Sequence, residues 1–273
     1  MASTMVERRS RSHIEVRFPP EAAYKQPTVV CDRSRGDWPS TPRRATEVEP
    51  VSMDAPQRAE MEVWVFVDFV CSWCYQGKRH LERALAGFPE RDRVAIRWRS
   101  FELDPTIAAD AGLADEELAR RRNISLEEAR AMHEGTEQQG LELGIRFDFG
   151  RARRGNTFSA HRALQMAHQH GVQDAVNERL MATYFCEGGA IGDPATVAAA
   201  AGQAGLDETA VAEMLAGDGF VADVRADEQE AQALGISAVP FFVIDRRYGI
   251  AGAHRAPVLL QAIEQAWAER QPA

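Results

Sequence analysis

The sequence has few cysteines, an excess of acidic over basic residues and no long apolar run, and each feature excludes a class of protein. Four cysteines in 273 residues, at positions 31, 71, 74 and 186, are too few and too unevenly spaced for a disulfide scaffold. The formal net charge of -9 offers no basic surface for nucleic acid or an anionic membrane. No apolar segment reaches the roughly 18 residues that a membrane helix needs. We therefore expect no nucleic acid and no membrane as partner.

The first 60 residues differ in composition from the rest of the chain. They hold seven of the 13 prolines and lack sustained periodicity, which predicts a disordered or loosely attached extension over residues 1–60. Residues 1–20 contain arginines but no apolar h-region, so they do not resemble a secretory signal. Glu7 and Glu15 interrupt the arginines, which argues against an organelle transit peptide. We predict a cytoplasmic location.

A buried strand and a helix are predicted directly after this extension. Residues 63–70 form an almost continuous apolar run rich in β-branched and aromatic side chains, which is typical of a strand buried on both faces. A helix with regularly spaced apolar side chains follows and ends at Gly87 and Pro89. Alternation over residues 94–98 predicts a second strand. The resulting β-α-β unit implies a parallel pair of strands.

The middle of the chain has a helical pattern from residue 106 to residue 234. Ser125 with Glu128 predicts a capping box, and Asp115 is expected to cap the preceding helix. Asp193 followed by Pro194 predicts an N-cap and a first turn.

Strand-like residues return at 239–244 and 248–251, before a final amphipathic helix. The sequence thus predicts an α/β fold of the β-α-β … β-β-α plan. Its two halves are residues 61–105 and 235–270, and residues 106–234 form a large all-helical insertion.

Cys71 and Cys74 lie where the first predicted strand ends and the helix begins. Unpaired N–H groups and the dipole at a helix N-terminus stabilise a thiolate, which is the nucleophile of disulfide exchange. Cys74, one turn later, can attack a mixed disulfide on Cys71. This pattern predicts a redox pair in which Cys71 attacks and Cys74 resolves. Because Cys31 and Cys186 are isolated in the sequence, the roughly four close ligands of a structural metal site are missing and we expect no metal.

Asp68 and Pro240 each leave two interpretations open. A carboxylate near the end of a buried strand needs hydrogen bonds, so Asp68 either takes the Cys74 proton or caps the active-site turn. Pro240 opens the later strand and cannot donate to a ladder, so it belongs at an edge or a bulge. An edge there would let an extended substrate pair beside the thiols, and the alternative is an ordinary strand-opening proline.

Dispersed motifs resemble one family. Cys71-Ser-Trp-Cys-Tyr-Gln-Gly-Lys78 is similar to the C-P-W-C-Y-x-G-K signature of the DsbA-like thioredoxin superfamily, in its FrnE-like branch. The similarity covers roughly residues 61–267, through segments 101–105, 156–162, 184–185, 235–242 and 252–253. It implies a thioredoxin-like fold with a helical insertion, and a cis Val239–Pro240 bond that faces the cysteines. It also implies disulfide oxidoreductase or isomerase activity without a cofactor.

The same resemblance suggests substrate-binding residues. Asn156 and His161 lie in a family segment and either line the substrate groove or hold the insertion to the sheet. Trp73, with Tyr75 close by, would offer an exposed aromatic platform or simply pack. Val239 would present its backbone to a substrate. Ser72 stands where the family usually has Pro, which leaves the direction of electron flow open.

We therefore predict a thiol–disulfide oxidoreductase, or a disulfide isomerase, that acts on a disulfide- or thiol-containing protein or small molecule such as glutathione. Two alternatives share the fold. One is a glutathione-dependent isomerase or transferase, against which the retained Cys71 argues because such relatives have Ser at that position. The other is a non-catalytic binding module with inert thiols.

Overall fold

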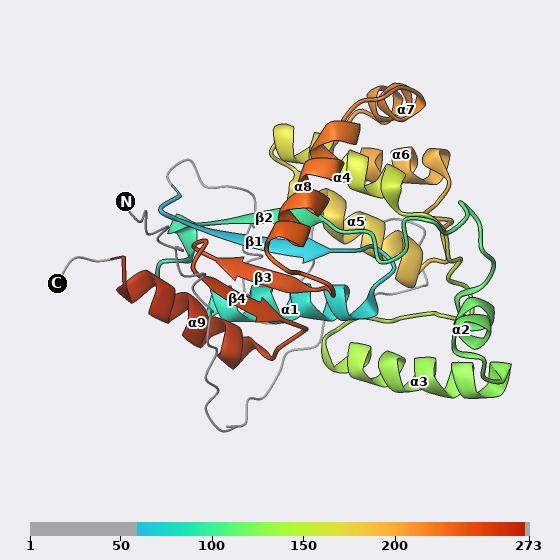
Figure 1. Ribbon diagram of the computed structural model, residues 1–273, viewed down its shortest axis with the longest axis horizontal. Coiled ribbons are helices and arrows are strands. Elements are labelled where there is room, and N and C mark those ends of the chain that lie inside the picture. The colour runs from blue at the N-terminus through green and yellow to red at the C-terminus, as the bar shows by residue number, and fades with distance from the viewer. Residues whose placement is uncertain (1–58, 271–273) are drawn as a thin grey trace, which may run out of the picture.

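Four strands form one mixed sheet in the order β2-β1-β3-β4 in the computed structural model, which describes residues 59–270 (Figure 1). The inner strand β1 (Met61–Val67) runs parallel to β2 (Val94–Ser100) and antiparallel to β3 (Phe241–Ile244). Strand β4 (Tyr248–Ala251) pairs antiparallel with β3. All of β1 except Glu62 is buried, as its apolar run predicts. The mixed α/β architecture expected from the sequence is confirmed.

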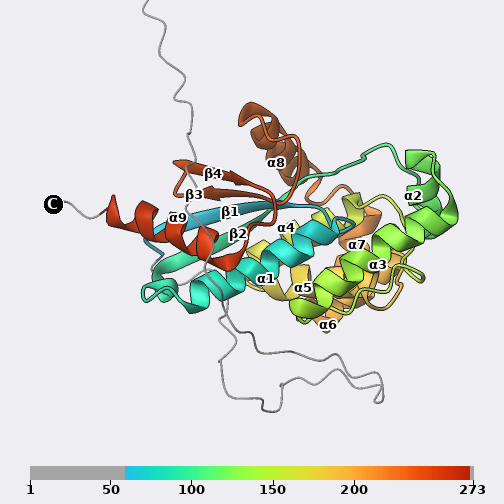
Figure 2. The same ribbon diagram turned by 90° about the horizontal axis from the view of Figure 1, so that it is seen from below.

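Two helices from opposite ends of this half of the molecule pack on each other. Helix α1 (Ser72–Ala86) follows β1 and leads through the short 3-10 helix η1 (Arg91–Arg93) to β2. Helix α9 (Ala256–Ala268) contacts α1 and β3 (Figure 2). Phe88 and Trp267 close this contact edge to face, with ring centroids 5.7 Å apart. Segments far apart in the sequence therefore form one thioredoxin-like unit.

The predicted helical insertion is confirmed between β2 and β3. Helices α4, α5 and α8 contact β2, whereas α2 and α3 pair with each other beyond the sheet (Figure 1). The insertion comprises α2 (Ala114–Arg122), α3 (Leu126–Glu142), α4 (Phe158–Gln169), α5 (Gln173–Phe185), α6 (Pro194–Gln203), α7 (Glu208–Ala216) and α8 (Val221–Ala233). Residues 1–58 lie outside the described residues, so the predicted extension and the domain boundaries stay predictions.

Two of the three predicted helix caps are confirmed. Ser125 and Glu128 form the capping box of α3, and the Asp193 side chain accepts the first-turn N–H groups of α6. The prediction for Asp115 is wrong. Leu113 is the N-cap of α2, because the Ala114 N–H is already bonded to the carbonyl of Ala152 and α2 begins there. Asp115 instead lies in the first turn and contacts His133.

The strand positions near the cysteines also differ from expectation. Strand β1 ends at Val67, three residues before the apolar run does, so Asp68 lies in the connection to α1. Pro240 lies before β3, which is paired on both sides, so its expected place on an edge strand is wrong. It needs no ladder N–H there, and its carbonyl accepts the Gly252 N–H at 2.8 Å.

Candidate redox site

Cys71 is the N-cap residue of α1, at the carboxyl end of β1. Its backbone is extended, with φ -99° and ψ 104°, and its carbonyl accepts the Cys74 N–H at 2.9 Å. Among the described residues, no side chain caps the first turn of α1 and that turn holds no acidic residue. The Cys71 sulfur therefore occupies the position from which an N-cap side chain meets the unpaired N–H groups of the first turn.

The two thiols differ in their access to solvent. Both are free, but Cys71 is 7% exposed and Cys74 is 0% exposed. Burial, followed by the neighbouring Cys71 sulfur, raises the pKa of the Cys74 thiol well above its ordinary value. Of these two residues only Cys71 keeps some exposed surface, and burial favours the protonated form of Cys74.

The loop before β3 lies against the Cys71 thiol. The Val239–Pro240 bond is cis, and the Cys71 thiol donates to the Val239 carbonyl at 3.4 Å. A Cβ atom at Gly77 would lie 3.0 Å from Cγ of Pro240 and 3.3 Å from Cζ of Phe242. Glycine at position 77 therefore lets α1 pack directly against this loop, and brings residues 168 positions apart into contact.

Asp68 lies beside the thiols with 1% of its surface exposed. Its Oδ2 atom accepts the Leu103 N–H at 2.7 Å, and its Oδ1 atom lies 3.7 Å from Nε2 of His161. Burial acts to raise the pKa of Asp68, but His161, the Leu103 N–H and Arg154 together hold it below the usual value. The buried carboxylate is thus ionised, and the backbone group that it caps follows β2.

The two residues of the predicted α4 segment have different surroundings. His161 is 0% exposed and packs on Phe69, with ring centroids 4.9 Å apart. A side chain without exposed surface cannot contact a substrate, so the structure favours the packing alternative for His161. Asn156 accepts the Phe158 N–H at 3.0 Å and donates to the Pro105 carbonyl at 3.3 Å, which orders the start of α4. Its substrate-binding role stays a prediction.

The aromatic residues beside the thiols separate into one exposed and one buried side chain. Trp73 is 50% exposed, as expected of a side chain that meets a substrate. For Tyr75 the structure favours the alternative of simple packing, since this side chain is only 3% exposed. Its hydroxyl donates to Glu178 at 2.6 Å and its ring stacks on Phe185. Trp73 alone remains available as an aromatic platform.

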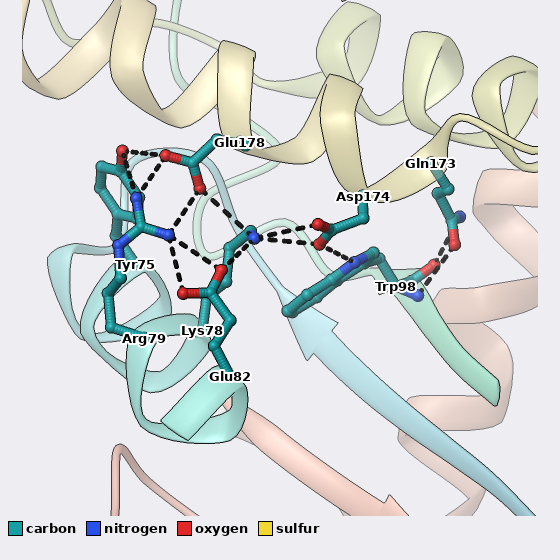
Figure 3. A network of polar contacts seen from close by, with 8 residues as sticks. All are labelled: Tyr75, Lys78, Arg79, Glu82, Trp98, Gln173, Asp174 and Glu178. Atoms are coloured by element: carbon teal, nitrogen blue, oxygen red, sulfur yellow. Dashed lines mark hydrogen bonds and ion pairs between the residues drawn. The ribbon is translucent and has the colours of Figure 1, made fainter. Parts of the chain in front are cut away.

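A group of partly buried charges around the buried Lys78, which the sequence analysis missed, joins α1 to α5 (Figure 3). We call it the α1–α5 charge cluster; its members are Tyr75, Lys78, Arg79, Glu82, Asp174 and Glu178. Nζ of Lys78 lies 2.5 Å from Glu82, 3.0 Å from Asp174 and 3.3 Å from Glu178. Arg79 pairs with Glu178 at 2.5 Å. A lysine four residues before Glu82 on an apolar helix face was the available signal.

The cluster satisfies its charges internally. Burial acts to lower the pKa of Lys78, but Asp174, Glu82 and Glu178 outweigh burial and leave it raised. The Trp98 indole N–H also donates to Asp174 at 3.0 Å, which ties the cluster to β2 (Figure 3). The helix that carries both cysteines is thereby fixed to the insertion and to the sheet.

The other two cysteines and the predicted absence of a metal site and of a membrane helix concern regions away from the Cys71–Cys74 pair. Cys186 is half-buried at the C-cap of α5, and Cys31 lies outside the described residues. Within residues 59–270, no group of three or more His, Cys, Asp or Glu side chains is arranged to hold a metal ion. No helix in that range is long and apolar enough to cross a membrane.

Comparisons with known proteins add to this geometry. Residues 62–264 match the model of the DSBA-like thioredoxin domain. A probable DsbA oxidoreductase from Streptomyces coelicolor is 38% identical, with a TM-score of 0.74 over 78% of this chain and 92% of that one.

More distant structures share the fold. They include a 2-hydroxychromene-2-carboxylate isomerase, with 14% identity and a TM-score of 0.56 over 77% of this chain and 97% of that one. Chlamydia trachomatis DsbA has 12% identity and a TM-score of 0.50 over 80% of this chain and 92% of its own. No curated protein sequence matches the chain significantly.

Proposed function

Because the chain belongs to the DsbA-like thioredoxin family of oxidoreductases, we propose that it exchanges disulfides with Cys71 as the attacking thiol and Cys74 as the resolving thiol. The observation that carries these roles is the unequal burial of the pair. Cys71 meets solvent at the start of α1, whereas Cys74 has no exposed surface and a raised pKa. Only an exposed thiol can open an external disulfide, and only a thiol behind it can attack the product from within.

The reaction has two balanced steps. The Cys71 thiolate attacks one sulfur of a substrate disulfide, the substrate S–S bond breaks, and one substrate thiolate leaves and takes up a proton. Cys74 then loses its proton and attacks the Cys71 sulfur, so that the mixed disulfide breaks and the second substrate thiolate leaves. Two electrons pass from the pair to the substrate, and the reverse sequence oxidises a dithiol. Asp68 is proposed to receive the Cys74 proton.

The proposed substrate is a protein or small molecule that carries a disulfide or thiols, glutathione included. The exposed Trp73 ring and the Val239 backbone beside Cys71 support contact with an extended substrate segment. The Cys74 thiol argues against a glutathione-dependent isomerase, because the chain itself then supplies the second thiol of the reaction. Membership of the FrnE-like branch and a cytoplasmic location remain part of the proposal.

Trapping of mixed disulfides tests the two roles. Cys74→Ser is expected to accumulate mixed disulfides with substrate, because attack survives while resolution is lost, and Cys71→Ser is expected to trap nothing. Intact-mass spectrometry of each variant after exposure to an oxidised peptide measures this, with Cys186→Ser as the matched control. Equal trapping by the Cys71→Ser and Cys74→Ser variants would contradict the assignment.

A further inference from the structure

Resolution requires Cys74 to lose its proton inside the fold. Cys74 is 0% exposed and its pKa is raised, so at neutral pH the direct loss of its proton to bulk water is slow. Asp68 lies beside the pair, since its backbone carbonyl accepts the Cys71 N–H at 3.1 Å, and its charge acts to raise the pKa of Cys74. The carboxylate nevertheless has a pKa below the usual range, so a proton placed on it is easily passed on.

The two oxygen atoms of Asp68 have different surroundings. Oδ2 is occupied by the Leu103 N–H at 2.7 Å, whereas Oδ1 has no hydrogen-bond partner among the described residues. The polar atom on that side is Nε2 of His161, at 3.7 Å. A movement of less than 1 Å would therefore bring the oxygen and the ring nitrogen into hydrogen-bonding distance.

His161 is the unusual member of this group. It is 0% exposed, and neither Nδ1 nor Nε2 has a hydrogen-bond partner in the described part of the chain. A buried polar group without a partner costs about 1–3 kcal/mol, so a purely structural position would favour an apolar ring here. An imidazole can take a proton on one nitrogen and release one from the other.

A second group of charged side chains interacts electrostatically with His161. Glu102 is electrostatically attracted to His161, and its side chain is 1% exposed. Its Oε2 accepts from Arg225 at 2.7 Å, and Arg225 also pairs with Glu228 at 2.6 Å. The Arg225 side chain is 44% exposed. Glu102 is therefore the inner end of a charged group that reaches the surface on α8.

We propose that His161 accepts the proton of the resolving thiol through Asp68 and holds it until the pair is reduced again; this rests on the proposed exchange reaction. The Cys74 S–H bond breaks and the proton moves through the Asp68 carboxylate to Nε2 of His161. The electron pair left on Cys74 forms the bond to the Cys71 sulfur, and the bond between Cys71 and the substrate sulfur breaks. His161 acts through Asp68, so it is a positioning residue and not one that touches the reacting sulfurs.

The charged and titratable groups around this path come from several elements. Cys74 lies on α1, and Asp68 lies in the connection between β1 and α1. Arg154, which precedes α4, and Tyr184 on α5 act electrostatically on Asp68 or on each other. Glu102 follows β2, and Arg225 and Glu228 lie on α8. Replacing His161 leaves all of these groups in place.

Release of thionitrobenzoate from dithiobis(nitrobenzoate) separates the two steps in the full chain carrying Cys31→Ser and Cys186→Ser. The first equivalent reports attack by Cys71, and the second reports resolution by Cys74. We expect His161→Gln to slow the second phase at neutral pH by at least ~10-fold while the first phase stays within about twofold. The defect should shrink from about pH 6 to about pH 9, because hydroxide then removes the Cys74 proton directly.

The matched control is His133→Gln, since His133 is also a largely buried histidine beside an aspartate, stacked on Phe149 at 4.0 Å, and lies in α3. It should leave both phases unchanged. A wild-type second phase in His161→Gln, or a slowing independent of pH, would overturn the proposal. If His161→Gln does not fold, His161→Asn takes its place and should slow the second phase severalfold; a wild-type rate there overturns the proposal. Failure of the proposed function itself would show differently, as a parent chain that never releases the second equivalent.

Discussion

Two groups of charged residues lie beside the active-site helix, and they differ in how completely their polar atoms are paired. In the α1–α5 charge cluster, Lys78 meets three carboxylates and Tyr75 donates to Glu178. In the Asp68–His161 pair, one carboxylate oxygen and both ring nitrogens have no hydrogen-bond partner among the described residues. Lys78 at the centre of the cluster is 2% exposed and its three carboxylate partners are 18–29% exposed, whereas Asp68 and His161 are at most 1% exposed.

This difference in hydrogen-bond pairing distinguishes a group that stabilises the fold from a group that can take part in proton transfer. A fully paired cluster has no vacant acceptor atom at neutral pH, and its effect is to fix α1 on α5. An incompletely paired group lowers stability but keeps acceptor atoms available next to a thiol that must lose a proton. The comparison predicts that changes in the first group lower stability, whereas changes in the second slow exchange.

The largest effect is expected from breaking the complete cluster. Lys78→Met leaves Glu82, Asp174 and Glu178 without their shared cation, and loss of one partner from a buried ionic group typically costs about 3–5 kcal/mol. Urea unfolding measures this loss. Arg153→Ala, which breaks an exposed pair with Asp110, is the control and should leave the free energy of unfolding nearly unchanged. Equal losses in the two variants would remove the distinction between the cluster and the surface.

Asp68→Asn should give the opposite result. The amide oxygen of the asparagine can still accept the Leu103 N–H, so the free energy of unfolding should change by no more than about 1 kcal/mol. The side chain can no longer take a proton, and resolution should slow by about 10²-fold. The second phase of thionitrobenzoate release checks the rate. A large loss of stability with normal resolution would place Asp68 among the structural residues.

Acid titration sharpens the comparison. Burial acts to raise the pKa of Glu178, but Arg79 and Lys78 outweigh it and lower the pKa from 4.5 to about 2. The stabilisation from ionised Glu178 is therefore present above pH 4.5 and is lost as the pH falls from 4.5 towards about 2. Glu178→Gln should lose less stability over this window than the unaltered chain does. Parallel curves of unfolding free energy against pH would contradict the assigned pairing.

The smallest effect on stability is expected at Trp73, which belongs to neither group. Because its ring is 50% exposed, Trp73→Ala should change the free energy of unfolding by less than about 0.5 kcal/mol. It should raise KM for a disulfide-bonded peptide severalfold and leave both phases with dithiobis(nitrobenzoate) unchanged. Unchanged KM for the peptide would show that the ring is not a substrate platform.

The part of the fold that local patterns specify was predictable from the sequence. The buried run at residues 63–70, the Ser125 capping box and the Asp193–Pro194 helix start each depend on neighbours within a few positions, and each reports on local structure. Strand order was harder to predict. Pro240 indicated an edge strand. However, β3 is an inner strand, because β4 begins seven residues after β3 does and pairs with the side of β3 that faces away from β1.

The candidate site divides in the same way. The thiol pair was visible because C-x-x-C is a local pattern. The buried position of Tyr75 was not, because it depends on Glu178, 103 residues away. The Lys78 cluster and the Asp68–His161 contact likewise join residues on different elements, and no local spacing encodes their distances.

Alkylation of the reduced full chain tests the central claim most directly. Iodoacetamide is added at neutral pH to the folded protein, and the labelled peptides are assigned by mass spectrometry. We expect Cys71 to be labelled while Cys74, fully buried and with a raised pKa, stays unlabelled until the chain is unfolded. Labelling of Cys74 in the folded protein as fast as that of Cys71 would contradict the division into an attacking and a resolving thiol.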